Sequence, residues 1–291
     1  MEYITILIQA IIQGLTEFLP VSSSGHLSIA QHFMDVGEES LTVSIFLHVG
    51  TLIAVFIAFR RDVWGMFCEF FLSFYDIIRG KFSWYGMNDN RRMLFMVIAA
   101  TLLLLPVMLV KDFFTAPMLD DDIIFEGAAL IFTATMLFMA DSCVKGIKPA
   151  SEIHLKDALT VGFFQVIALF PGVSRSGSTI SAGLFCGLSR KTAVTFSFML
   201  GIPAILGASI LEIRELTGEA SGVNAVSMNW FALGLGLVVA MIVGLMAIKL
   251  VKMLIRKEKF KIFAIYTLTL GILCIVWGIF ENITGFTFRL S

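Results

Sequence analysis

Six long runs of apolar residues, almost free of charged side chains, constrain the fold of this chain more than any other feature. They cover residues 40–59, 93–110, 123–140, 192–211, 228–248 and 262–280. A helix rises about 1.5 Å per residue, so about 20 apolar residues match the ~30 Å hydrocarbon core of a bilayer. With 58% hydrophobic and 15% charged residues, the composition is also too apolar for a water-soluble domain. The sequence therefore predicts an all-α polytopic membrane protein.

The net charge of the chain bears on which kinds of molecule it can bind. The net charge is −1 and the isoelectric point is near 6.4, which gives no electrostatic reason to bind nucleic acid. The apolar stretch at residues 3–16 has no basic residue before it, although a secretory leader requires one. We therefore expect membrane lipids around the protein, no nucleic acid partner, and a first segment that belongs to the fold.

Two further apolar stretches, residues 3–34 and 155–189, are broken by clusters of Pro, Gly and Ser. Basic residues accumulate on the cytoplasmic side of membrane proteins. In this chain they gather at 60–61, 79–92, 145–156, 190–191 and 249–261. The six runs alternate correctly only if each broken stretch enters the membrane and returns to its own side. This pattern predicts two re-entrant hairpins, both termini outside, and the aromatic stretch 63–78 on or dipping into the cytoplasmic face.

The two broken stretches also resemble each other. Residues 13–30 align with 165–182 at a constant offset of 152 (165 − 13), and seven of the 18 aligned pairs are identical. Three apolar runs follow each stretch, and the charge pattern has the two enter from opposite sides. This is the arrangement of an inverted repeat, in which two broken helices build a site near the bilayer midplane. We expect one membrane domain with halves 1–140 and 141–291, each a re-entrant hairpin plus three transmembrane helices.

Polar side chains in these stretches are candidates for function, because polar groups and irregular backbone are costly at membrane depth. Gln13 and Glu17 are four residues apart and would share one helix face. Arg175 is the only cation between residues 165 and 182, so a purely structural Glu17–Arg175 ion pair is one interpretation. The other is a phosphate site, in which Gly177 admits an anion to the backbone and Arg175 adds a bidentate guanidinium.

The histidines allow two interpretations as well. His26 follows Gly25, within reach of Ser22 to Ser24, so a Ser–His pair could supply a nucleophile and a base. The plainer interpretation is a histidine that hydrogen-bonds the turn. His48, inside the run 40–59, has no Ser/Gly cluster beside it, and we interpret it as an internal hydrogen-bond partner.

At these residues the chain resembles a known family. The frame Gln13-x-x-x-Glu17-Phe-Leu-Pro-Val-Ser-Ser-Ser-Gly-His26, joined to Pro171-Gly-Val-Ser-Arg-Ser-Gly-Ser-Thr179, is similar to the bacterial undecaprenyl-diphosphate phosphatase (bacitracin resistance protein) family. The resemblance covers essentially the whole chain. It implies hydrolysis of undecaprenyl diphosphate to undecaprenyl phosphate and inorganic phosphate at the outer, periplasmic face of the bacterial cytoplasmic (inner) membrane. This reaction recycles the lipid carrier for peptidoglycan synthesis and confers bacitracin resistance.

The resemblance also implies site residues and a divalent cation, Mg²⁺ or Ca²⁺. The implied catalytic residues are Glu17, Ser23, His26 and Arg175. The implied phosphate-binding residues are Ser22, Ser174, Arg175, Ser176, Gly177 and Thr179. Glu17 would hold the metal with Gln13, where the family pattern allows Glu or Gln, so a scheme that needs two carboxylates on the metal is in doubt.

We therefore expect a membrane hydrolase acting on a polyprenyl diphosphate, with the lipid tail in an apolar groove between helices. The nucleophile stays open between Ser23, His26 and water, and a homodimer stays open as the assembly. The main alternative is a transporter or flippase for a lipid phosphate or small anion, because inverted repeats with broken helices are a common transporter plan. The trio Glu17, Ser23 and His26 favours chemistry, which a carrier does not need.

Overall fold

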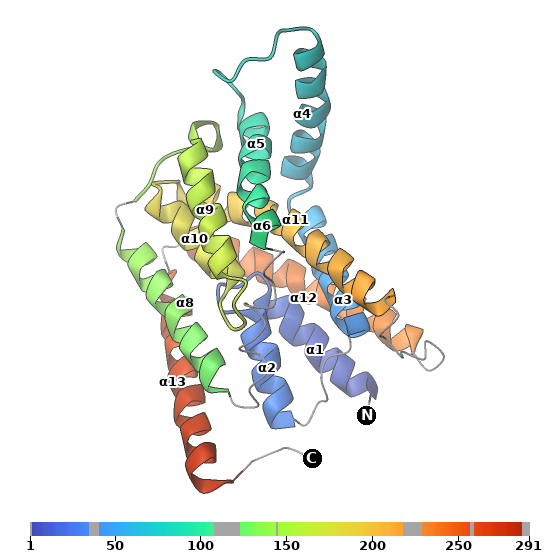
Figure 1. The fold of residues 1–291 in the computed structure, drawn as a ribbon, viewed down its shortest axis with the longest axis vertical. Helices are drawn as coiled ribbons and strands as arrows, with labels where there is room; N and C mark the ends of the chain where they lie inside the picture. The colour runs from blue at the N-terminus through green and yellow to red at the C-terminus, as the bar shows by residue number, and fades with distance from the viewer. Residues whose placement is uncertain are drawn as a thin grey trace.

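The computed structural model describes residues 2–34, 41–107, 123–143, 145–217, 229–256 and 259–286. Across these ranges the regular structure is helical, and the only β-type pairing is an isolated bridge between Lys148 and Leu188. This confirms the predicted all-α class. Figure 1 shows an elongated bundle, with the connection between α4 (Arg60–Ile78) and α5 (Asp89–Leu102) at one end. The end of α13 (Lys261–Thr284) lies at the other.

Six helices of the described chain are long and apolar enough to cross a membrane, as predicted, and they make this a multi-pass membrane protein. They are α3 (Leu41–Ala58), α5 continued by α6 (Leu104–Val107), α8 (Ile124–Ser142), α11 (Arg190–Thr217), α12 (Trp230–Arg256) and α13. Residues 40, 108–110 and 228, at the ends of three predicted runs, lie outside the described residues.

The largest difference from the predicted spans is at the end of α12, which continues to Arg256 where we predicted an end at residue 248. The lysines in this part of α12 do not end the helix, because a long lysine side chain can place its amine beside a polar group. The Lys252 amine donates to the carbonyl of Ala58 (3.3 Å) and lies 3.4 Å from the centre of the Phe59 ring.

Both broken stretches are pairs of short helices joined by an irregular turn. The first pair is α1 (Glu2–Thr16) and α2 (Ser23–Met34), and the second is α9 (Leu155–Ile167) and α10 (Arg175–Phe185). Helix α9 begins with a capping box between His154 and Asp157. The two turns lie near the middle of the bundle (Figure 1). Their return to the same side of a membrane, and the inverted relation of the two halves, remain predictions.

Glycines bring the long helices close together. Helix α8 packs along α13, and helix α12 packs along α3 and α1 (Figure 1). A Cβ on Gly127 would lie 2.8 Å from the Gly271 carbonyl oxygen, and one on Gly271 would lie 2.7 Å from the Gly127 carbonyl oxygen. Small residues of this kind allow close backbone contact between membrane helices, where the hydrophobic effect contributes little to association.

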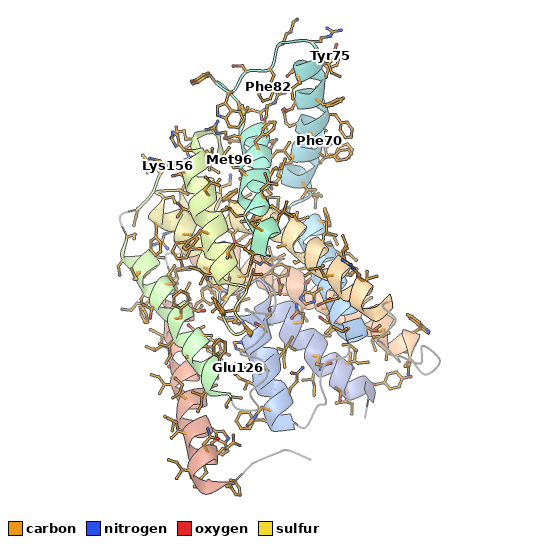
Figure 2. The ribbon with its side chains drawn as sticks, viewed as in Figure 1. Phe70, Tyr75, Phe82, Met96, Glu126 and Lys156 are labelled. Atoms are coloured by element: carbon orange, nitrogen blue, oxygen red, sulfur yellow. The ribbon has the colours of Figure 1, made fainter. Side chains whose placement is uncertain are left out.

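The aromatic stretch 63–78 forms most of helix α4, which packs against α5. Arg91 of α5 joins the two helices, because its guanidinium binds both Glu69 (2.7 Å) and Asp76 (2.8 Å) of α4. Most of the aromatic side chains of α4 are exposed, and Figure 2 shows Phe70 and Tyr75 at this end of the molecule. Contact of this apolar surface with the cytoplasmic membrane face remains a prediction.

The packing of α3 on α12 predicts that Gly50→Ala destabilises the protein. The added Cβ would lie 2.4 Å from the backbone oxygen of Leu237, which cannot move without shifting α12. Overpacking of this kind costs about 1–3 kcal/mol, so we expect a lower midpoint in thermal melts of the detergent-solubilised protein. Gly234→Ala is the control, because its Cβ meets nothing within 4 Å. Equal midpoints for both variants would contradict the close packing.

Candidate active site

A cavity of about 230 Å³ lies where the two turns meet helices α3 and α11. One part of its wall is polar and the other is apolar, formed by Ala168, Val173 and the α11 side chains. The residues around it are Thr16, Glu17, Ser23, Ser24, His48, Ala168, Val173, Ser174, Arg175, Ala204, Ile205 and Ala208. The cavity therefore combines charged and hydroxyl groups with an apolar surface in one place.

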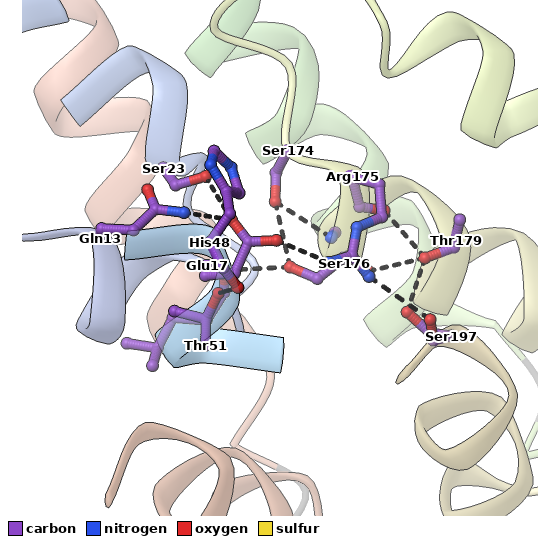
Figure 3. Close-up of polar contacts among 12 residues, drawn as sticks. Gln13, Glu17, Ser23, His48, Thr51, Ser174, Arg175, Ser176, Thr179 and Ser197 are labelled. Carbon is purple, nitrogen blue, oxygen red and sulfur yellow. Dashed lines mark hydrogen bonds and ion pairs between the residues drawn. The ribbon is translucent and has the colours of Figure 1, made fainter. Parts of the chain in front are cut away.

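Glu17 is the centre of the polar wall (Figure 3). Its Oε1 accepts from the Arg175 guanidinium at 2.7 Å, and its Oε2 accepts from Ser23 Oγ at 2.9 Å. Gln13 Nε2 donates to the same Oε2 at 3.0 Å. The side chains of Glu17 and Arg175 are only 8% and 17% exposed, so the ion pair is largely desolvated. The Glu17–Arg175 pair considered from the sequence is thus present, with a hydroxyl on the other carboxylate oxygen.

The two turns are hydrogen-bonded to each other in a reciprocal way. The backbone N–H of Gly172 donates to Ser24 Oγ (3.1 Å), and Ser176 Oγ donates to the carbonyl of Leu19 (3.0 Å). Ser24 and Ser176 are an aligned pair of the sequence repeat, since 176 − 24 = 152. Each hairpin therefore uses the same serine to hold the other.

Within each turn another hydrogen bond repeats at the same offset. Gly25 N donates to Ser22 Oγ (3.2 Å), and Gly177 N donates to Ser174 Oγ (3.0 Å). These bonds sit at the starts of α2 and α10, whose first residues, Ser23 and Arg175, line the cavity. A helix N-terminus carries partial positive charge. Two such ends and a guanidinium thus make the cavity suitable for an anion.

The residues predicted from the sequence divide into two groups. Glu17, Ser23, Ser174 and Arg175 line the cavity, and Gln13 supports Glu17. The other predicted phosphate ligands use their polar atoms in hydrogen bonds to other groups of the protein. They are Ser22, Ser176, Gly177 and Thr179. Thr179, for example, bonds the Arg175 carbonyl (2.8 Å) and Ser197 Oγ (2.6 Å).

His26 does not line the cavity. Its Nδ1 lies 2.6 Å from the Ser22 carbonyl oxygen, and its Nε2 lies 2.7 Å from the hydroxyl of Tyr266 on α13. His48 of α3 lines the cavity instead. Its Nδ1 is 2.9 Å from the Ser44 carbonyl, so it is the internal hydrogen-bond partner we predicted, but its ring also borders the site. The high cost of a histidine inside an apolar span could have indicated this from the sequence.

Helix α11 contributes a residue that the sequence did not suggest. A Cβ on Gly201 would lie 2.3 Å from the Arg175 Nη1 atom, so this glycine makes the space that the guanidinium occupies. Arg175 Nη1 also approaches the Ser197 carbonyl one turn earlier on α11 (3.4 Å). No motif connects Gly201 to Arg175, because the contact arises only from helix packing.

The donor set limits how a metal could bind. In the described part of the chain, no three His, Cys, Asp or Glu side chains gather as a metal site. Besides hydroxyl groups, the cavity wall offers the Glu17 carboxylate as an oxygen donor. Gln13, which is hydrogen-bonded to Glu17, adds an Oε1 that is buried and has no hydrogen-bond partner among the described residues. Such a set suits Mg²⁺ or Ca²⁺ when a substrate phosphate and water complete the coordination, as is common for Mg²⁺.

Comparison with known proteins places the chain among a set of close relatives. A sequence profile described as bacitracin resistance protein BacA matches residues 6–273. A protein named undecaprenyl-diphosphatase from Methanobrevibacter smithii is 40% identical over 286 residues, which cover 96% of this chain and 99% of that protein. Another of that name from Alkaliphilus metalliredigens is 37% identical over 274 residues, 92% of this chain and 96% of the relative.

The reciprocal serine bonds predict a stability effect. Ser176→Ala removes one of the two hydrogen bonds that the Leu19 carbonyl accepts, the other coming from the Val21 N–H (2.7 Å). Ser24→Ala removes the acceptor of the Gly172 N–H. Each should lower the free energy of unfolding by about 1 kcal/mol, with the larger effect at Ser176, which is 1% exposed. Ser178→Ala is the matched control, because its buried Oγ has no hydrogen-bond partner among the described residues. Thermal melts in detergent measure the difference, and melts that rank Ser178→Ala lowest would refute the role of the two serines.

Proposed function

Because this chain belongs to the bacitracin resistance protein BacA family, we propose that it hydrolyses undecaprenyl diphosphate to undecaprenyl phosphate and inorganic phosphate. The observation that carries the proposal is the Ser23 hydroxyl on the Glu17 carboxylate (2.9 Å), in a cavity that also holds Arg175. The reaction would take place in the bacterial inner membrane with the site open to the outer face. There it would recycle the lipid carrier for peptidoglycan synthesis and so confer bacitracin resistance.

Charge explains why this cavity suits a diphosphate. A lipid diphosphate carries roughly three negative charges, which need fixed positive groups when water is excluded. Arg175 offers a planar guanidinium that matches phosphate oxygens, and the starts of α2 and α10 add partial positive charge. In the free protein Arg175 is bonded to Glu17, so an arriving phosphate shares or replaces that contact.

The geometry favours Ser23 as the attacking group. Ser23 Oγ would attack the terminal phosphorus as its proton passes to Glu17, which already accepts its hydrogen bond. The bond between that phosphorus and the bridging oxygen breaks, Glu17 returns the proton to the leaving oxygen, and undecaprenyl phosphate departs. Water then hydrolyses the phosphoserine to serine and inorganic phosphate. His26 is not needed as the base in this scheme, because its ring lies outside the cavity lining.

A divalent cation fits the same wall. Glu17 and the unpartnered Gln13 Oε1 would hold it together with oxygens of the substrate. When bound, the cation would offset phosphate charge as a Lewis acid. Gln13 keeps its side chain in place for this by donating to Glu17 through Nε2 (3.0 Å), which leaves the amide oxygen as the ligand.

The apolar wall would receive the start of the lipid tail. Ala204, Ile205 and Ala208 of α11 line the cavity with apolar side chains. Ala204 and Ala208 are one helical turn apart and carry small side chains, which leaves room for a branched prenyl unit. The phosphates and the tail thus have separate surfaces in one cavity.

A transporter for lipid phosphates is not favoured. It would use Arg175 and the two helix ends in the same way, but it has no use for a serine hydroxyl that donates to a buried carboxylate. The relatives carry the name of a diphosphatase over nearly their whole length.

Phosphate release from a polyprenyl diphosphate by the purified protein tests the proposed function. We expect Glu17→Gln to reduce the rate by about 10²–10⁴-fold, the usual contribution of a general base. The fold should stay intact, since the Gln carbonyl still accepts from Arg175 and its amide can donate to Gln13 Oε1. Glu152→Gln is the control, because Glu152 is exposed and outside the cavity. EDTA should lower the wild-type rate if a cation takes part.

Two outcomes would contradict this assignment. Wild-type protein that binds the lipid but releases no phosphate would exclude hydrolysis. A Glu17→Gln variant that loses thermal stability, and regains it when Arg175→Gln is added, would show that Glu17 serves only as the buried partner of Arg175. Removal of one partner of such a pair typically costs ~3–5 kcal/mol.

The proposed orientation is tested by cysteine labelling. Tyr85, which is 90% exposed, belongs to the connection between α4 and α5, and Phe286, which is 54% exposed, follows the last residue of α13. Figure 1 shows this connection and the end of α13 at opposite ends of the long axis. An impermeant maleimide added to intact spheroplasts should modify Phe286→Cys above the level of the unsubstituted protein, and should modify Tyr85→Cys only after lysis. Lysed spheroplasts are the control for reactivity at both positions. The reverse pattern would place the cavity on the cytoplasmic side.

A further inference from the structure

Ser22 holds an unusual backbone conformation directly before Ser23. Among the described residues it is the only one other than glycine with a positive φ, 73°. This left-handed region is strained for a residue with a Cβ, and such conformations persist only where neighbouring groups hold them. Helix α2 begins at the next residue, so the Ser22 backbone sets the direction in which Ser23 Oγ points toward Glu17.

The His26 ring holds the Ser22 carbonyl. Its Nδ1 lies 2.6 Å from the Ser22 oxygen, and the His26 backbone N–H also donates to that oxygen at 3.3 Å. A carbonyl oxygen can only accept, so Nδ1 must carry the proton of this hydrogen bond. In a neutral imidazole the other nitrogen, Nε2, then has a lone pair and accepts.

Tyr266 supplies the donor for that lone pair. Its hydroxyl lies 2.7 Å from His26 Nε2, and the two rings stack with centroids 5.6 Å apart at an angle of 13°. Tyr266 lies on α13, 240 residues farther along the chain, and neither ring lines the cavity. The hydrogen bonds thus form a chain from the Tyr266 hydroxyl through both ring nitrogens to the Ser22 carbonyl.

We propose that Tyr266 is a positioning residue for the hydrolysis: it fixes the Nδ1–H tautomer of His26, which holds the left-handed Ser22 turn that presents Ser23 to Glu17. The inference rests on the proposed function. In this role His26 transfers no proton, which distinguishes it from the nucleophile or base considered from the sequence. Tyr266 touches neither substrate nor reacting atoms and acts only through His26.

Substitutions at both ends of this chain test the proposal. Tyr266→Phe removes one hydroxyl, so we expect kcat to fall about tenfold, the effect of one lost hydrogen bond, with KM unchanged. His26→Asn places an amide N–H near the position of Nδ1, so it should keep activity within about tenfold of wild type, whereas His26→Leu should lose more than 100-fold. In the His26→Asn background, Tyr266→Phe should have no further effect, because its acceptor is already gone.

Matched controls come from residues far from the turn. Tyr85→Phe removes a hydroxyl from a side chain that is 90% exposed. His154→Asn replaces the N-cap residue of α9 with one that caps equally well. Both should match wild-type activity. A folded His26→Asn that is as inactive as His26→Leu would overturn the proposal, because it would show that His26 moves a proton.

The tautomer can be read independently of activity. In ¹⁵N NMR spectra of the labelled protein, the His26 ring signals are those that disappear in His26→Asn. We expect the Nδ1–H tautomer in wild type and loss of the hydrogen-bonded Nε2 signal in Tyr266→Phe. An Nε2–H tautomer in wild type would overturn the chain of hydrogen bonds even if the enzyme is active. Absence of phosphate release with the expected tautomer would overturn the proposed function and leave the tautomer assignment standing.

Discussion

Hydrogen bonds between the two irregular turns hold the centre of this molecule together. Without these bonds, irregular backbone would be too costly inside an apolar bundle. The turns leave the helical hydrogen-bond ladder, and backbone groups without partners are costly away from water. Ser24 of the first turn accepts a hydrogen bond from the Gly172 N–H of the second, and Ser176 of the second turn donates one to the Leu19 carbonyl of the first. Because these bonds bring the starts of α2 and α10 together, they also create the space between them. The same contacts that satisfy the backbone therefore build the cavity.

The two turns share a frame but differ in the residues that carry charge. In the alignment of the two turns, Glu17 corresponds to Leu169 and Ser23 corresponds to Arg175. The first turn therefore contributes the carboxylate and the second contributes the guanidinium. The carboxylate of one turn binds the guanidinium of the other at 2.7 Å. The divergence thus yields one site with an acid and a cation side by side.

The sequence predicted the parts that local patterns encode. Hydropathy located the six spans, and the Ser/Gly clusters located both turns and four residues of the cavity wall, Glu17, Ser23, Ser174 and Arg175. Side-chain directions were not encoded locally. Ser176 and Thr179 look like phosphate ligands in sequence, but packing turns their hydroxyls toward backbone and neighbouring side chains. The role of Tyr266 depends on the packing of a helix distant in the chain, so no local motif could reveal it.

At Gly201, the residue that would most stabilise the helix is not the residue that the site requires. Alanine in a helix interior is generally more stable than glycine, by about 0.5–1 kcal/mol, so a search for stabilising changes would choose this position in α11. The methyl group would occupy the place of the Arg175 guanidinium, 2.3 Å from Nη1. A guanidinium at the end of a flexible side chain can move aside, so the fold would survive while the anion-binding group is displaced. Engineering for thermal robustness should therefore leave this glycine untouched, since its missing side chain is part of the site.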